Sequence, residues 1–187
     1  TTRIGKSNWM VVEADESDGS LVNLFPKIAV ITNINKEHID FYKTYKNLKK
    51  YFFHFINNIP FDGVAIYCKD NLDLKRLILK SKKKNKISYG LQKGSDVRAT
   101  NILINEKGSF FDINIKKTNL LRKETIKKVR LNILGKHNIQ NSLAAVTVAK
   151  ILNINTVDLK NAFKMFDGVK RRFTLVCNFK GIKIIDD

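Results

Sequence analysis

The chain has 187 residues, 43% of them hydrophobic, which is enough for one sizeable folded core and argues against a disordered chain. Its net charge of +18 allows either a basic nucleic-acid-binding module or a compositional bias toward lysine, and the absence of RRM, helix-turn-helix and zinc-finger patterns favours the bias. The two cysteines lack CxxC spacing, which argues against a disulfide framework and a structural zinc site and suits a reducing compartment. No apolar run reaches about 18 residues and the N-terminus lacks the apolar core of a signal peptide, so we expect a cytoplasmic protein that does not span a membrane.

The first half of the chain alternates between strand and helix patterns. Short apolar runs rich in Val and Ile predict strands covered on both faces, and apolar residues at spacings of three and four predict amphipathic helices. The predicted strands are 9–14, 27–34, 63–69 and 86–90, and the predicted helices are 45–59 and 71–80. Residues 8–90 therefore predict a βαβα series, which gives a mainly parallel α/β sheet flanked by helices.

The pattern changes after Gly90. Residues 97–116 alternate polar and apolar side chains around a turn at 105–108, which predicts an antiparallel hairpin followed by a third strand. The remaining predicted elements are the third strand at 127–135, helices at 137–152 and 157–166, and two strands within 171–187. The second of these helices is expected to be capped by Asn155 and to stop before Gly168.

Four carboxylates follow the first apolar run within six positions: Glu13, Asp15, Glu16 and Asp18. Open parallel sheets bind ligands at the C-terminal ends of their strands, beside helix N-termini that hold phosphate. Mg²⁺ takes one or two carboxylates at such sites, together with phosphates and waters. We therefore expect Glu13, the first residue beyond the apolar run at 9–12, to be an inner metal ligand. A solvated acidic loop that caps the next helix would give the same pattern.

A histidine, His38, follows the second predicted strand in the segment TNINKEHID. If the two strands are neighbours, His38 lies beside Glu13 at one edge of the sheet. An imidazole among carboxylates suits a metal or phosphate contact, although a lone histidine after a strand is also a common structural residue.

Three polar residues, His137, Asn138 and Asn141, occupy the start of the long predicted helix in LGKHNIQNSLAA. Asn138 and Asn141 are three residues apart and share a helix face. Their carboxamides carry both donors and acceptors, which suits the edge of a purine, although asparagine at a helix start commonly serves only as a cap.

Taken in order, these segments resemble the successive motifs of the Mur ligases across the whole chain. The matching segments are EADESD (13–18), TNINKEHID (32–40), GKHNIQNSLAA (135–145), GVKRRF (168–173) and IIDD (184–187). EADESD is most similar to members that join L-alanine to UDP-N-acetylmuramate. The resemblance implies a P-loop NTPase-like central domain over residues 1–179, with a small antiparallel subdomain, and the start of a C-terminal ligase domain at 180–187.

The resemblance also implies a chemistry and a set of residues. The reaction is ATP-dependent amide formation, in which the carboxylate of UDP-N-acetylmuramate becomes an acyl phosphate that the amino group of L-alanine attacks. Glu13 and His38 would hold Mg²⁺, and Arg172 would reach the phosphates of ATP. The implied nucleotide contacts are His137, Asn138 and Asn141 at the adenine and Asp187 at the ribose. The oligomeric state stays open.

The chain also departs from the family pattern. It contains no GxxGK[ST] phosphate loop, because RIGKSN at 3–8 lacks the first glycine and leads into a predicted strand. We therefore expect a partial central domain that is inactive alone. Some members carry a modified lysine near a second metal, and Lys49 and Lys50 lie in the corresponding helix without a secure match. The rival interpretations are another ligase of the superfamily, such as a murein peptide ligase, and a basic nucleic-acid-binding module.

Overall fold

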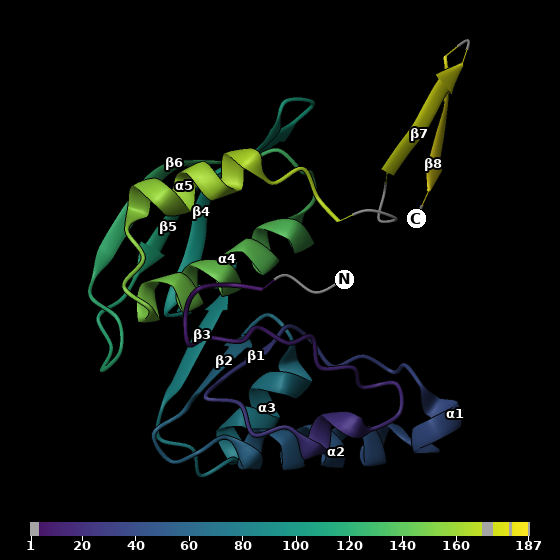
Figure 1. Cartoon of the computed structure of the whole chain (residues 1–187), viewed down its shortest axis with the longest axis vertical. Coiled ribbons are helices and arrows are strands. Elements are labelled where there is room, and N and C mark those ends of the chain that lie inside the picture. Colours follow the sequence, from purple (N-terminus) through teal and green to yellow (C-terminus); the bar gives the residue numbers. More distant parts are fainter. Residues whose placement is uncertain (1–3, 170–173, 180, 187) are drawn as a thin grey trace. The chain divides into compact units, whose positions relative to one another are not determined.

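The computed structural model describes residues 4–169, 174–179 and 181–186 (Figure 1). Its helices are η1 (Ser20–Asn23, a 3-10 helix), α1 (Ile39–Tyr42), α2 (Tyr45–Asn58), α3 (Leu72–Lys80), α4 (Lys136–Ile151) and α5 (Thr156–Met165). Its strands are β1 (Ile28–Ile31), β2 (Val64–Cys68), β3 (Lys86–Gly90), β4 (Val97–Asn105), β5 (Gly108–Ile115), β6 (Glu124–Leu131), β7 (Thr174–Phe179) and β8 (Ile182–Asp186).

Strands β1 to β6 form one sheet in the order of the sequence, and β7 and β8 form a second sheet. The pairing is parallel between β1 and β2 and between β3 and β4, and antiparallel from β4 through β6. This confirms the predicted mixed α/β class. Internal contacts divide the chain into two units, Thr1–Tyr67 with Asn71–Lys86 and Cys68–Asp70 with Ile87–Asp187, and each is described by itself.

The first unit is built on β1, β2 and the helices α2 and α3. All five residues of β2 are buried, which explains its unbroken apolar sequence. Helix α2 begins where the Thr44 side chain accepts a hydrogen bond from the Asn47 amide at 3.1 Å, and it ends before Pro60, which has no amide proton to continue it. Asn71 caps α3 in the same way, accepting from the Leu74 amide at 2.9 Å. These helices confirm the predicted periodicity.

The apolar segment 9–14 is not a strand, so the prediction for it was wrong. Its side chains are exposed, with Trp9 at 48%, Met10 at 83% and Val11 at 97% of full exposure. A strand needs a neighbouring strand to pair with its backbone groups. In the part of the chain that the structure describes, β1 pairs with β2 alone and 9–14 has no such neighbour. Apolar composition therefore did not suffice to make a strand there.

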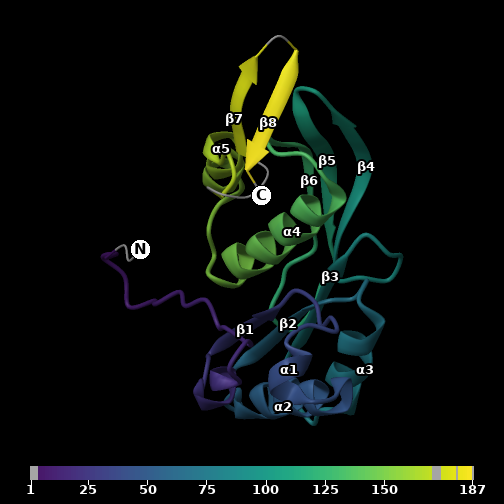
Figure 2. The same cartoon turned by 90° about the vertical axis from the view of Figure 1, so that its right-hand side faces the viewer.

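The second unit combines β3 to β6 with α4 and α5. Figures 1 and 2 show both helices on the same face of β4 to β6, and α4 buries Ile139, Leu143 and Val146 completely. The hairpin at 105–108 and the Asn155 cap of α5 are confirmed, since Asn155 accepts from the Asp158 amide at 2.8 Å. Strand β6 ends four residues before the predicted position, because the chain turns at Gly135, with φ of 106°, to enter α4.

Strands β7 and β8 pair antiparallel with each other, as expected for the tail. The expected domain boundary after residue 179 falls at Lys180, outside the described residues, and stays a prediction.

No helix in the described ranges is both long enough and apolar enough to cross a membrane.

Candidate functional site

The acidic segment 13–18 uses its carboxylates in two ways. Asp15 accepts a hydrogen bond from the Ser17 amide at 2.8 Å, and Asp18 accepts one from the Ser20 amide at 2.9 Å. These backbone bonds lower the pKa of both aspartates below its usual value, and they fix the turns that lead into η1. Glu13 is exposed, and Glu16 turns toward His38.

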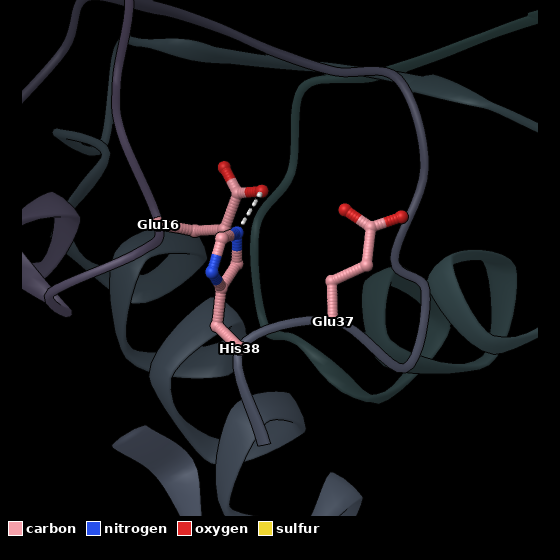
Figure 3. A group of neighbouring side chains, drawn as sticks. All are labelled: Glu16, Glu37 and His38. Carbon is pink, nitrogen blue, oxygen red and sulfur yellow. Dashed lines mark ion pairs between the residues drawn. The ribbon is translucent and has the colours of Figure 1, made fainter. Parts of the chain in front are cut away.

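Glu16, Glu37 and His38 form a cluster in the first unit (Figure 3). Each offers one ligand atom, and these atoms lie within 4.8 Å of one another. The Glu16 Oε1 to His38 Nε2 distance is 3.7 Å. It is the one group of three or more candidate metal ligands among the residues that the structure describes.

The backbone around His38 is held in an uncommon conformation. His38 has φ of 54°, in the left-handed region that side chains rarely adopt, and it precedes the short helix α1. The Tyr42 hydroxyl donates a hydrogen bond to the backbone carbonyl of Glu16, which ties the acidic segment to α1. Burial, with the charge of Glu16, raises the pKa of Tyr42 to about 12, so this donor keeps its proton. Tyr42 also makes edge-on contact with Tyr51 of α2 at 5.0 Å between ring centroids.

The donor set of this cluster fits a divalent cation. Mg²⁺ binds through one or two carboxylates and keeps several waters, and the side chains of Glu16 and His38 are each 37% exposed, which leaves room for water. An imidazole beside carboxylates also suits Mn²⁺ and other transition metals. His38 was expected here, whereas Glu16 and Glu37 were not predicted as ligands. Glu13 lies outside the cluster, and its role as a ligand stays a prediction.

The start of α4 holds the predicted adenine-binding residues of the second unit. Gly135 has φ of 106°, which side chains rarely adopt, and a Cβ there would lie 2.7 Å from Cε1 of the His137 ring. Asn138 donates from Nδ2 to the Leu134 carbonyl at 2.7 Å, which secures the loop before the helix. Asn141 is exposed, and its carboxamide makes no hydrogen bond within the described ranges. Of the two asparagines, Asn141 is therefore the one with both its donor and its acceptor groups available.

Two lysines, Lys49 and Lys50, lie in α2, the helix in which the family resemblance expects a modified lysine. Lys49 lies 3.6 Å from an Asp73 carboxylate oxygen and 4.5 Å from the centroid of the Tyr45 ring, so its ammonium group has charge and aromatic partners. Lys50 instead lines a shallow hollow of about 310 Å³ with Val22, Tyr51 and His54. A modified lysine at either position stays a prediction. Arg172 and Asp187 lie outside the described residues, and their predicted contacts stay predictions.

Comparison with known proteins places these features in one family. The family model described as "Mur ligase middle domain" matches residues 4–149. The UDP-N-acetylmuramate–L-alanine ligase of Rhodospirillum centenum is 40% identical over 185 residues, which cover 99% of this chain and 38% of that protein. The chain thus spans well under half the length of that relative.

Solved structures agree on the fold. MurF from Acinetobacter baumannii superposes with a TM-score of 0.72 at 25% identity, over 91% of this chain and 36% of that one. The UDP-N-acetylmuramate-alanine ligase MurC from Thermotoga maritima also gives a TM-score of 0.72, at 20% identity, over 93% of this chain and 37% of that one. The order of sequence motifs, the sheet topology and the family match all agree: the chain belongs to the Mur ligase middle-domain family.

Proposed function

We propose that this chain is the central, nucleotide-binding part of a cytoplasmic ATP-dependent ligase that joins L-alanine to UDP-N-acetylmuramate. One observation carries the proposal: a relative whose name gives both substrates is 40% identical in sequence over 185 residues, which cover 99% of this chain. A second observation supports it, because the cluster of Glu16, Glu37 and His38 offers the kind of ligands that hold a cation beside phosphates.

The proposed reaction has two steps. The carboxylate of UDP-N-acetylmuramate attacks the γ-phosphorus of ATP, and the bond to the ADP oxygen breaks. The amino group of L-alanine then attacks the acyl carbon, loses a proton, and phosphate leaves with its electron pair. Activation by ATP is needed because a carboxylate does not itself condense with an amine in water. Such phosphoryl transfer depends mainly on positioning and on charge stabilisation.

Different residues would carry these tasks. Glu16, Glu37 and His38 would hold Mg²⁺, which when bound offsets charge on the phosphate groups. Glu13 remains the alternative carboxylate that the sequence motif favours. Asn141, with His137 and Asn138 beside it, would contact adenine, and the family resemblance adds Arg172 at the phosphates and Asp187 at the ribose.

A phosphate-release assay on the intact protein that contains this chain tests the proposal. Release should require ATP, UDP-N-acetylmuramate and L-alanine together, and omission of any one should return the rate to the no-enzyme blank. Activity with a murein peptide in place of L-alanine would instead favour a murein peptide ligase. ATP hydrolysis that requires neither UDP-N-acetylmuramate nor L-alanine would contradict a ligase.

A further inference from the structure

A carboxylate outside the predicted site organises the region around the start of α4. Asp70 follows β2 and accepts three hydrogen bonds with its two oxygens. Oδ2 accepts from the Leu91 amide at 2.8 Å and from Gln140 Nε2 at 2.7 Å, and Oδ1 accepts from the Gln92 amide at 3.0 Å. All of these groups belong to the second unit. Asp70 therefore joins the loop after β3 to the first turns of α4.

The chain makes room for this carboxylate. A Cβ at Gly90 would lie 2.7 Å from Asp70 Oδ1 and 2.8 Å from Cγ, so a side chain at Gly90 would displace the carboxylate. Tyr89, next to it, is fully buried and its hydroxyl lacks a hydrogen-bond partner among the described residues. Burial, with Cys68 and Asp70 nearby, raises the pKa of the Tyr89 hydroxyl, so it stays neutral beside the network.

Gln140 carries the network into the helix. It lies one residue before Asn141 and two after Asn138, so an anchor on its side chain fixes the rotation of the turn that bears both asparagines. Its amide donates to a carboxylate, and hydrogen bonds to charged acceptors are stronger and more directional than neutral ones. The loop bond of Asn138 to Leu134 secures the helix start on its other side.

We propose that Asp70 and Gln140 are positioning residues of the nucleotide site, which hold the first turns of α4 in the orientation that presents Asn141 to adenine. The inference rests on the proposed function, because it assumes that this helix start receives the nucleotide. In this role neither residue would touch the nucleotide. Their contribution is preorganisation: an untethered turn would have to be ordered when the nucleotide binds, which weakens affinity.

The test compares variants of the intact protein for ADP affinity by calorimetry, for the KM of ATP and of L-alanine, and for melting temperature. Gln140→Leu keeps the side-chain bulk and removes the amide. It removes the hydrogen bond to Asp70 and a weaker one to Cys68 Sγ at 3.9 Å. It should weaken ADP binding and raise the KM for ATP by about three- to tenfold, with the KM for L-alanine nearly unchanged. Asp70→Asn, which keeps an acceptor oxygen, should weaken ADP binding less than Asp70→Ala.

Two matched controls separate positioning from general destabilisation. Lys150 lies in the same helix as Gln140 but ten residues farther on, where its ammonium pairs with Glu124 at 3.0 Å. Lys150→Met should lower the melting temperature and leave ADP affinity unchanged. Tyr89→Phe removes the unpartnered hydroxyl beside Asp70 without touching the three hydrogen bonds, and it should also leave ADP affinity unchanged.

Amide exchange over residues 136–143 gives a readout that does not depend on nucleotide. Exchange there should be faster in Gln140→Leu than in Lys150→Met, and equal exchange would overturn the inference. A wild type that binds ADP no more tightly than Gln140→Leu would also overturn it while leaving the proposed function intact. A wild type that binds no ADP or ATP would refute the proposed function itself.

Discussion

Replacing Glu16 by glutamine should weaken divalent-cation binding far more than replacing Glu13 by glutamine. Glu16 lies 3.7 Å from His38 and shares a cluster of ligand atoms with it, whereas Glu13 is exposed and outside that cluster. In water, two unit charges about 4 Å apart interact by about 1 kcal/mol, and a dication at closer range interacts several times more strongly. Displaced water offsets much of this gain, so we expect a loss of about 1.4 to 2.8 kcal/mol, or ten- to hundredfold in affinity.

The assay is a calorimetric titration of the intact protein with Mn²⁺, followed by competition with Mg²⁺. Glu37→Gln serves as a second test of the cluster and should behave like Glu16→Gln. Glu13→Gln is the matched control, because it removes the same charge from the same acidic segment. Melting temperatures without metal should be similar for all three variants, since these carboxylates are at least partly exposed.

Equal losses of affinity in Glu16→Gln and Glu13→Gln would show that the cluster has no special role, and would refute the assignment of Glu16 as a ligand. A larger loss in Glu13→Gln would restore the ligand that the sequence motif favours. Binding that survives His38→Ala unchanged would remove the imidazole from the site.

Three further predictions concern other parts of the chain. In the intact protein, Asn141→Ala should raise the KM for ATP by about one to two orders of magnitude and leave that for L-alanine nearly unchanged, whereas a mere lowering of the melting temperature would indicate a structural role. The 187-residue chain alone should release no phosphate above the blank, because it contains no GxxGK[ST] loop; substrate-dependent release would contradict this. Hydrogen bonds from the Asn101 side chain and from the Lys128 amide lower the pKa of Asp112 below 3.8. The ionised Asp112 therefore stabilises the fold above that pH, and this contribution is lost as the pH falls through the lowered pKa. The difference in melting temperature between wild type and Asp112→Asn should therefore shrink as the pH falls below about 4, and a constant difference would exclude this linkage.

Much of the fold is predictable because its signals are local. Pro60 ends α2 and Asn155 caps α5, and both features act through atoms within a few residues in the sequence. The prediction of a strand at 9–14 was wrong, because strand pairing depends on a neighbouring strand that the local sequence pattern does not specify. Glu13 was chosen as a metal ligand because it directly follows the apolar run at 9–12, and its role as a ligand stays a prediction.

The site shows the same division between local and distant information. His38 and Asn138 stand in motifs that mark them from the sequence alone. The bond between Asp70 and Gln140 joins residues 70 positions apart, and nothing in either local sequence points to the other. Glu16 was visible as one of four clustered carboxylates, but its approach to His38 at 3.7 Å depends on how the chain folds and has no local signal.

The most direct test of the proposed ligase activity follows an oxygen atom. The intact protein is supplied with UDP-N-acetylmuramate labelled with ¹⁸O in its carboxylate, together with ATP and L-alanine, and the inorganic phosphate is analysed by mass spectrometry. An acyl phosphate transfers one carboxylate oxygen to phosphorus, so each phosphate released during ligation should carry one ¹⁸O atom. Unlabelled phosphate formed alongside the alanine adduct would contradict the proposed mechanism, and the absence of any adduct would contradict the proposed function.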